Sequence, residues 1–130
     1  KLAEKLSQSA TAFNKTLPIL LQVNTSEESS KEGFLPDSAL LTEEVHRIAA
    51  LPGLKLDGLM TIGPLSEQER DIRQAFERLR HLRDQIETSL PALKLPELSM
   101  GMSGDFPLAL QEGATYLRVG SLIFGRRHTP

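Results

Sequence analysis

The sequence has no cysteine and no tryptophan, and it has one tyrosine among 130 residues. Without cysteine the chain forms no disulfide and offers no thiolate to a metal ion, which fits a reducing compartment. Its uninterrupted apolar runs are only a few residues long, far below the roughly 20 residues that cross a bilayer. We therefore expect a cytoplasmic protein that does not enter a membrane.

The chain also lacks a strong excess of positive or negative charge. Fifteen Lys and Arg face 17 Asp and Glu, so the net charge is −2, and no basic block is present. The arginine-rich segment 69–84 carries acidic residues at spacings of three and four, which is typical of a solvated helix face. This balance argues against nucleic acid as a partner.

The sequence shows no spaced histidine or carboxylate motif of a metal or hydrolytic site. His46 and His81 lie in amphipathic segments, and His128 lies near the end of the chain. Solvated histidines on helix surfaces are the favoured interpretation.

Hydrophobic periodicity divides the chain into alternating helices and strands. Pro18 ends the first helix, Asp37 or Ser38 caps the second, and Ser66 opens the third with a capping-box pattern. The predicted helices are 1–15, 39–51, one that starts at Ser66, and 106–113; the predicted strands are 19–24, 55–64, 96–102 and 116–124.

This order contains no strand–turn–strand hairpin, so it predicts a parallel α/β sheet with right-handed crossovers. A complete (β/α)₈ barrel takes about 250 residues. We expect residues 1–130 to form one domain, the C-terminal half of a TIM-type barrel, with four parallel strands alternating with helices and without the N-terminal strands.

Two neighbouring strand ends run from apolar residues into glycine and serine. They are "GMSGD", with Ser103, and "VGSL", with Gly120 and Ser121. In a barrel of this kind, phosphate binds after strands seven and eight, where small residues let backbone N–H groups approach it. A turn and a helix cap would explain either segment alone, but both together predict a phosphate site.

Arg118 lies between Leu117 and Val119 in the last predicted strand, where a guanidinium needs a partner. That partner is either an acidic group in a structural ion pair or a ring nitrogen of a ligand. Asn24 either faces a ligand at the barrel mouth or only starts the loop after its strand. Met102 is expected to pack in the barrel, and it is also included among the candidate cofactor-binding residues.

Several segments together resemble the pyridoxal phosphate homeostasis protein family. They are "LLQVN", "SKEGF", "GLMTIGP", "LSMGMSGDF" and "RVGSLIFG", in order along essentially the whole chain. The resemblance implies a barrel related to the N-terminal domain of alanine racemase, with pyridoxal phosphate (PLP) as the cofactor. It assigns Ser103, Gly120 and Ser121 to the phosphate and Arg118 to the pyridine nitrogen.

The same resemblance implies a Schiff-base lysine on the first barrel strand, and no lysine of this sequence matches that position. We expect that lysine in an N-terminal part of the protein outside these residues. The implied function is PLP homeostasis without a dedicated reaction, in a protein that is monomeric when whole. The alternative is a PLP-dependent amino-acid racemase, for which Tyr116 is the only tyrosine available as a second base.

Overall fold

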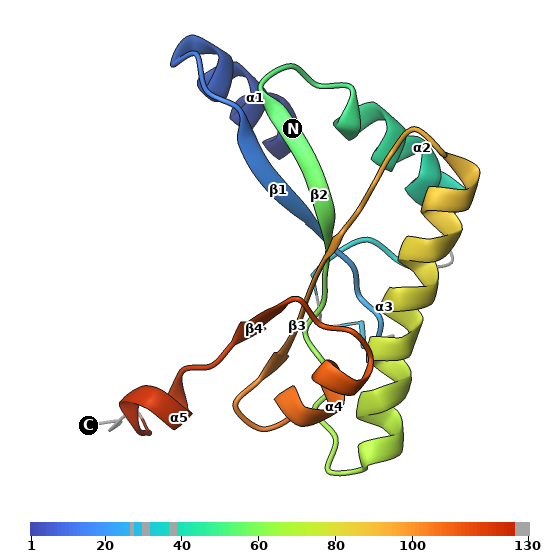
Figure 1. Ribbon diagram of the computed structural model, residues 1–130, viewed down its shortest axis with the longest axis vertical. Helices are drawn as coiled ribbons and strands as arrows, with labels where there is room; N and C mark the ends of the chain where they lie inside the picture. The colour runs from blue at the N-terminus through green and yellow to red at the C-terminus, as the bar shows by residue number, and fades with distance from the viewer. Residues whose placement is uncertain (27, 30–31, 37–38, 127–130) are drawn as a thin grey trace.

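Helices and strands alternate along the computed structural model, which describes residues 1–26, 28–29, 32–36 and 39–126 (Figure 1). The helices are α1 (Leu2–Ala12), α2 (Ala39–Ala49), α3 (Glu69–Ser89), α4 (Phe106–Gln111) and α5 (Ser121–Phe124). The strands are β1 (Leu17–Gln22), β2 (Leu54–Met60), β3 (Glu97–Met102) and β4 (Tyr116–Arg118).

The strands form one sheet in the order β1-β2-β3-β4, and each neighbouring pair is parallel. This confirms the predicted parallel half-barrel. The carboxyl ends of all these strands therefore lie along the same edge of the sheet, which is the edge where the site residues are expected.

The hydrophobic core lies between the sheet and the helices that cover one of its faces, α2 and α3 most visibly (Figure 1). Alternate strand residues point into this core: Leu21, Leu59, Leu98 and Met100 are buried there. Their neighbours in sequence therefore point to the opposite face of the sheet. No helix in the described part of the chain combines the length and the apolar character that a membrane span requires.

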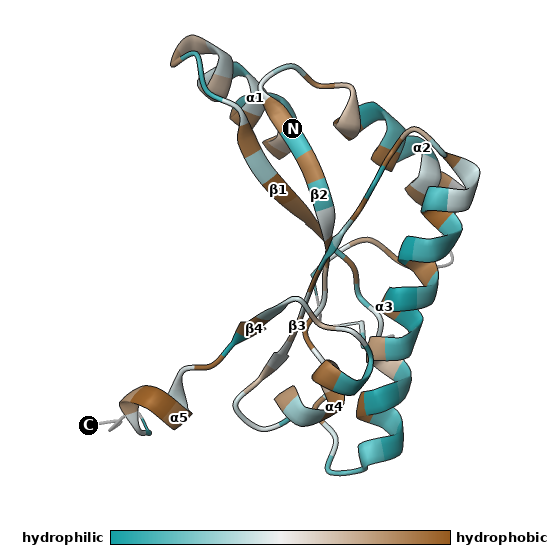
Figure 2. Ribbon diagram, in the orientation of Figure 1, coloured by the Kyte–Doolittle hydropathy of each residue, from teal (hydrophilic) through white to brown (hydrophobic). Residues whose placement is uncertain are grey.

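The predicted fourth strand, 116–124, is wrong over its second half. Strand β4 ends at Arg118, and Ser121–Phe124 form the short helix α5. Leu122, Ile123 and Phe124 are exposed, and α5 is strongly hydrophobic (Figure 2). A four-residue apolar run has no periodicity that separates strand from helix, so the sequence pattern alone misassigned it.

The predicted helix start at Ser66 is also wrong, because α3 begins at Glu69 with Gln68 as its N-cap. The Ser66 hydroxyl accepts the Gln68 N–H at 3.1 Å and donates to the Asp71 carboxylate at 3.1 Å. Ser66 therefore shapes the turn before the helix rather than capping it. The predicted caps of α2, Asp37 and Ser38, lie outside the described residues, as does His128.

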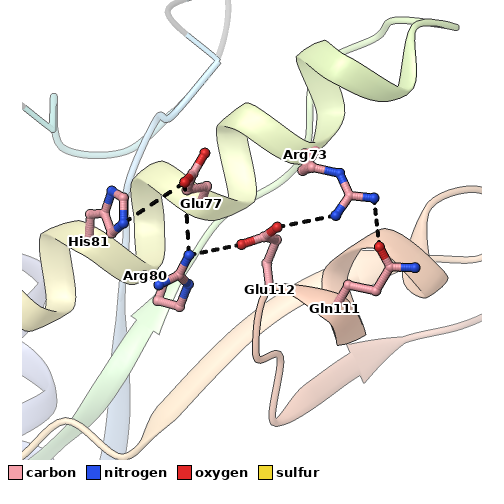
Figure 3. Close-up of polar contacts among 6 residues, drawn as sticks. All are labelled: Arg73, Glu77, Arg80, His81, Gln111 and Glu112. Atoms are coloured by element: carbon pink, nitrogen blue, oxygen red, sulfur yellow. Dashed lines mark hydrogen bonds and ion pairs between the residues drawn. The ribbon is translucent and has the colours of Figure 1, made fainter.

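A polar network fastens α4 to α3 (Figure 3). Glu112, just after α4 and 11% exposed, contacts Arg73 at 3.4 Å and Arg80 at 3.1 Å. Arg73 also donates to the Gln111 side chain at 2.6 Å. Because α4 directly follows the turn that carries Ser103, this network fixes the segment behind the candidate site.

We expect Glu112→Ala to lower the free energy of unfolding by about 1–2 kcal/mol, since a largely buried carboxylate with two arginine partners is lost. Asp84→Ala is the matched control, because Asp84 pairs with Arg83 at a site 53% exposed. Its expected cost is below about 0.5 kcal/mol. Denaturant unfolding of both variants checks this, and equal losses would contradict it.

Candidate functional site

The turn after β3 and the segment after β4 meet at the carboxyl edge of the sheet. The Ser103 hydroxyl oxygen accepts hydrogen bonds from the backbone N–H groups of Gly120, at 3.3 Å, and Leu122, at 3.4 Å. The two Gly–Ser segments singled out in the sequence are therefore adjacent in space.

These groups form a donor set suited to an anion. Two backbone N–H groups converge on one oxygen atom, and the hydroxyl that supplies this oxygen is itself a donor. A phosphate oxygen brought to the same place would accept from the same amides. Ser121 begins α5 directly between the two N–H groups, and its side chain is exposed.

Glycine is required at Gly101 for packing, whereas it is not required at Gly120. Gly101 has a φ of +99°, and a Cβ there would lie 2.7 Å from the Ala109 Cβ. A Cβ at Gly120 would meet nothing within 4 Å among the described atoms. The missing side chain at Gly120 therefore leaves open space beside the converging N–H groups.

Arg118 ends β4 on the sheet face opposite the core. Its Nη2 donates to the carbonyl oxygen of Thr61 at 2.6 Å, and its Nε is buried with no hydrogen-bond partner among the described residues. Burial lowers the pKa of Arg118, and the charge of Asp105 acts in the opposite direction. The guanidinium nevertheless stays protonated at physiological pH. A buried donor without a partner is costly and calls for an acceptor.

A pair of buried threonines supports Arg118, and the sequence analysis did not find them. The Thr61 hydroxyl donates to the Val23 carbonyl at 2.8 Å and shares a hydrogen bond with the Thr25 hydroxyl at 2.9 Å. Thr61 and Thr25 are 0% and 2% exposed. The carbonyl that holds Arg118 is thus fixed by contacts to the segment after β1.

Asn24 and Met102 take different places. The Asn24 side chain donates to the Glu28 carbonyl at 2.8 Å and accepts from the Ser26 hydroxyl at 3.1 Å, so it shapes the loop after β1. Met102 pairs with Arg118 in the register of β3 and β4, and it is 44% exposed. Packing of Met102 in the barrel and its contact with a cofactor both stay predictions.

Known proteins are similar to this chain in both sequence and fold. A pyridoxal phosphate homeostasis protein from Aquifex aeolicus is 41% identical over 126 residues, which are 97% of this chain and 54% of that protein. The structure of PipY from Synechococcus elongatus with PLP bound is 35% identical and superimposes with a TM-score of 0.83, covering 95% of this chain and 56% of that one.

A more distant likeness extends to an alanine racemase of Clostridium difficile. Its structure has a TM-score of 0.78 at 13% identity and covers 98% of this chain and 33% of that one, so it bears on the fold alone. The chain spans about half the length of the curated relatives it matches.

The family match covers nearly the whole chain. A family model described as the alanine racemase N-terminal domain matches residues 1–128. The homeostasis proteins among the relatives cover the same extent of this chain at 37–41% identity. The chain therefore belongs to the alanine racemase N-terminal domain family and resembles, over about half their length, the pyridoxal phosphate homeostasis proteins.

Proposed function

We propose that this chain forms the part of a PLP-binding protein that holds the cofactor's phosphate and its pyridine nitrogen. The whole protein would serve intracellular PLP homeostasis without a dedicated reaction. The observation that carries the proposal is the convergence of the Ser103 hydroxyl with the N–H groups of Gly120 and Leu122, together with the buried Arg118 Nε, which has no hydrogen-bond partner among the described residues.

The phosphate of PLP fits the donors at the strand ends. Ser103, Ser121 and the backbone N–H groups of Gly120 and Leu122 supply donors without a negative charge in the set. The open space at Gly120 allows close approach to the backbone. PLP bound to PipY, a relative at 35% identity, supports the same cofactor here.

The pyridine nitrogen fits Arg118. A guanidinium only donates hydrogen bonds, so a ring nitrogen that faces it acts as an acceptor and carries no proton of its own. Bound PLP supplies an electron sink for carbanion chemistry, and that sink is weak when the ring nitrogen is unprotonated. Arg118 would therefore hold the cofactor firmly while keeping its reactivity low, which favours a carrier over a racemase.

We further propose that the whole protein is a cytoplasmic monomer and that its Schiff-base lysine lies outside these 130 residues. Sedimentation that shows a stable dimer at all concentrations would contradict the first point. Rapid racemisation of amino acids by the whole protein would contradict the carrier role.

Replacing Ser121 with glutamate is expected to abolish most binding. A carboxylate about 5 Å from the phosphate costs roughly 3 kcal/mol for each unit of phosphate charge at an effective dielectric of about 20, which corresponds to at least a 100-fold loss of affinity. Calorimetric titration with pyridoxine phosphate measures this without interference, because that ligand lacks the aldehyde and forms no Schiff base.

Ser9→Glu is the matched control, since it places the same charge on an exposed position of α1. Its affinity for pyridoxine phosphate should equal that of the wild type. An unchanged dissociation constant in Ser121→Glu would count against the site.

A further inference from the structure

Asp105 closes the turn that carries Ser103 through two hydrogen bonds to Met102. The Asp105 N–H donates to the Met102 carbonyl at 3.2 Å, and the Asp105 carboxylate accepts the Met102 N–H at 2.6 Å. These two contacts fix the conformation of the turn, in which Ser103 and Gly104 lie between Met102 and Asp105.

Asp105 stands at the N-cap of α4, yet its side chain does not cap that helix. No side-chain cap hydrogen bond is formed, although an aspartate at this position ordinarily accepts an N–H of the first helical turn. The carboxylate instead points back to the end of β3. The cap interpretation of this segment therefore does not account for the Asp105 side chain.

The loop after β2 also comes close to the same carboxylate. A Cβ added at Gly63 would lie 2.9 Å from its second oxygen, so the backbone there approaches it closely. Its charge also acts on Arg118, where it opposes the effect of burial on the pKa. Asp105 thus contacts the end of β3, lies close to the loop after β2 and acts electrostatically on Arg118 at the end of β4.

We propose that Asp105 is a positioning residue for phosphate recognition: by closing the 102–105 turn it aims the Ser103 hydroxyl at the phosphate. The inference rests on the proposed PLP function and adds a residue that does not itself touch the ligand. What matters in this role is a hydrogen-bond acceptor at the right place, whereas a negative charge close to a phosphate only opposes binding.

Three substitutions in the whole protein separate acceptor geometry from charge. Asp105→Asn keeps an oxygen acceptor of the same reach and removes the charge, and we expect its affinity for pyridoxine phosphate to stay within about threefold of wild type or to increase. Asp105→Ala removes the acceptor, and we expect at least a tenfold loss. Asp105→Glu keeps the charge and displaces the acceptor, so a loss of similar size is expected.

The readout that isolates positioning is a comparison of pyridoxine phosphate, by calorimetry, with pyridoxine, by NMR titration at millimolar concentration. Asp105→Ala and Asp105→Glu should weaken the phosphate ligand and leave pyridoxine unchanged. If Asp105→Ala does not fold, the contrast between Asp105→Asn and Asp105→Glu carries the same test.

Equal affinity of Asp105→Glu and wild type for pyridoxine phosphate would overturn the inference, and so would a loss in Asp105→Asn as large as in Asp105→Glu. The proposed function fails in a different way. A wild-type protein that binds pyridoxine as tightly as pyridoxine phosphate would refute the phosphate site itself, whatever the Asp105 variants do.

Discussion

Arg118→Ala is expected to weaken binding of pyridoxine phosphate about five- to 150-fold. The substitution leaves the ring nitrogen as a buried acceptor without a donor, which costs about 1–3 kcal/mol. Calorimetry with pyridoxine phosphate is the measurement, because a covalent bond to PLP in the whole protein would mask the loss.

Arg118→Glu gives the sharper result. A carboxylate at this place favours a protonated pyridine, so the NMR shift of an isotope-labelled ring nitrogen should move from the unprotonated to the protonated range. Racemisation of amino acids by this variant, if it holds the cofactor, should rise slightly above a negligible wild-type rate.

The matched control is Arg70→Ala, because Arg70 is 88% exposed and lies at the start of α3. It should leave both affinity and ring-nitrogen shift unchanged. A wild-type complex with a protonated ring nitrogen would contradict the role given to Arg118, and so would an Arg118→Ala variant that binds as tightly as wild type.

Gly58→Ala is expected to have the largest effect on stability, a loss of about 3 kcal/mol or more in the free energy of unfolding. A Cβ at Gly58 would lie 1.8 Å from the carbonyl oxygen of Glu97 on β3. Gly58 follows an irregularity in β2, where Ile19 and Leu20 of β1 pair with Leu56 and Gly58 and leave Asp57 unpaired. Relief would require β2 and β3 to move apart.

Gly104→Ala is the control for this prediction, since a Cβ at Gly104 meets nothing within 4 Å. Denaturant unfolding should show a change below about 0.5 kcal/mol for Gly104→Ala. If Gly58→Ala were equally mild, β2 and β3 would not approach as closely at this point as the structure has them.

The parallel sheet was predictable because its evidence is spread over many residues. Apolar residues of α3 such as Phe76, Leu79 and Ile86 recur at helical spacing, and all three are buried. Leu98 and Met100 alternate with Ser99 and point into the core. Burial of one face imposes such patterns on a helix or a strand, so the patterns reveal the element.

The errors fall where burial imposes no pattern. Helix α5 is exposed along Leu122–Phe124, so no core face distinguishes helix from strand in its sequence. Before α3, Ser66 stands in a sequence pattern typical of a helix cap. Its hydroxyl instead forms hydrogen bonds with the Gln68 N–H and the Asp71 carboxylate. Local hydrogen bonds of this kind compete with capping and leave no separate mark in the sequence.

The residues of the candidate site could be predicted from the sequence, whereas the contacts that hold them in place could be predicted only in part. Glycine and serine at adjacent strand ends pointed to Ser103 and Gly120, which the structure brings together. The partner of Arg118 is the backbone carbonyl of Thr61. Because every residue carries a backbone carbonyl, the residue types do not indicate which one Arg118 contacts. The backward contact of Asp105 depends on a turn conformation that residue types alone do not specify.

A crystal structure of the whole protein loaded with PLP tests the central claim most directly. The account predicts phosphate oxygens within hydrogen-bond distance of the Ser103 hydroxyl and of the Gly120 and Leu122 N–H groups, with the Arg118 guanidinium facing the pyridine nitrogen. A complex in which Ser103 keeps its bonds to Gly120 and Leu122 while PLP is held elsewhere would contradict it.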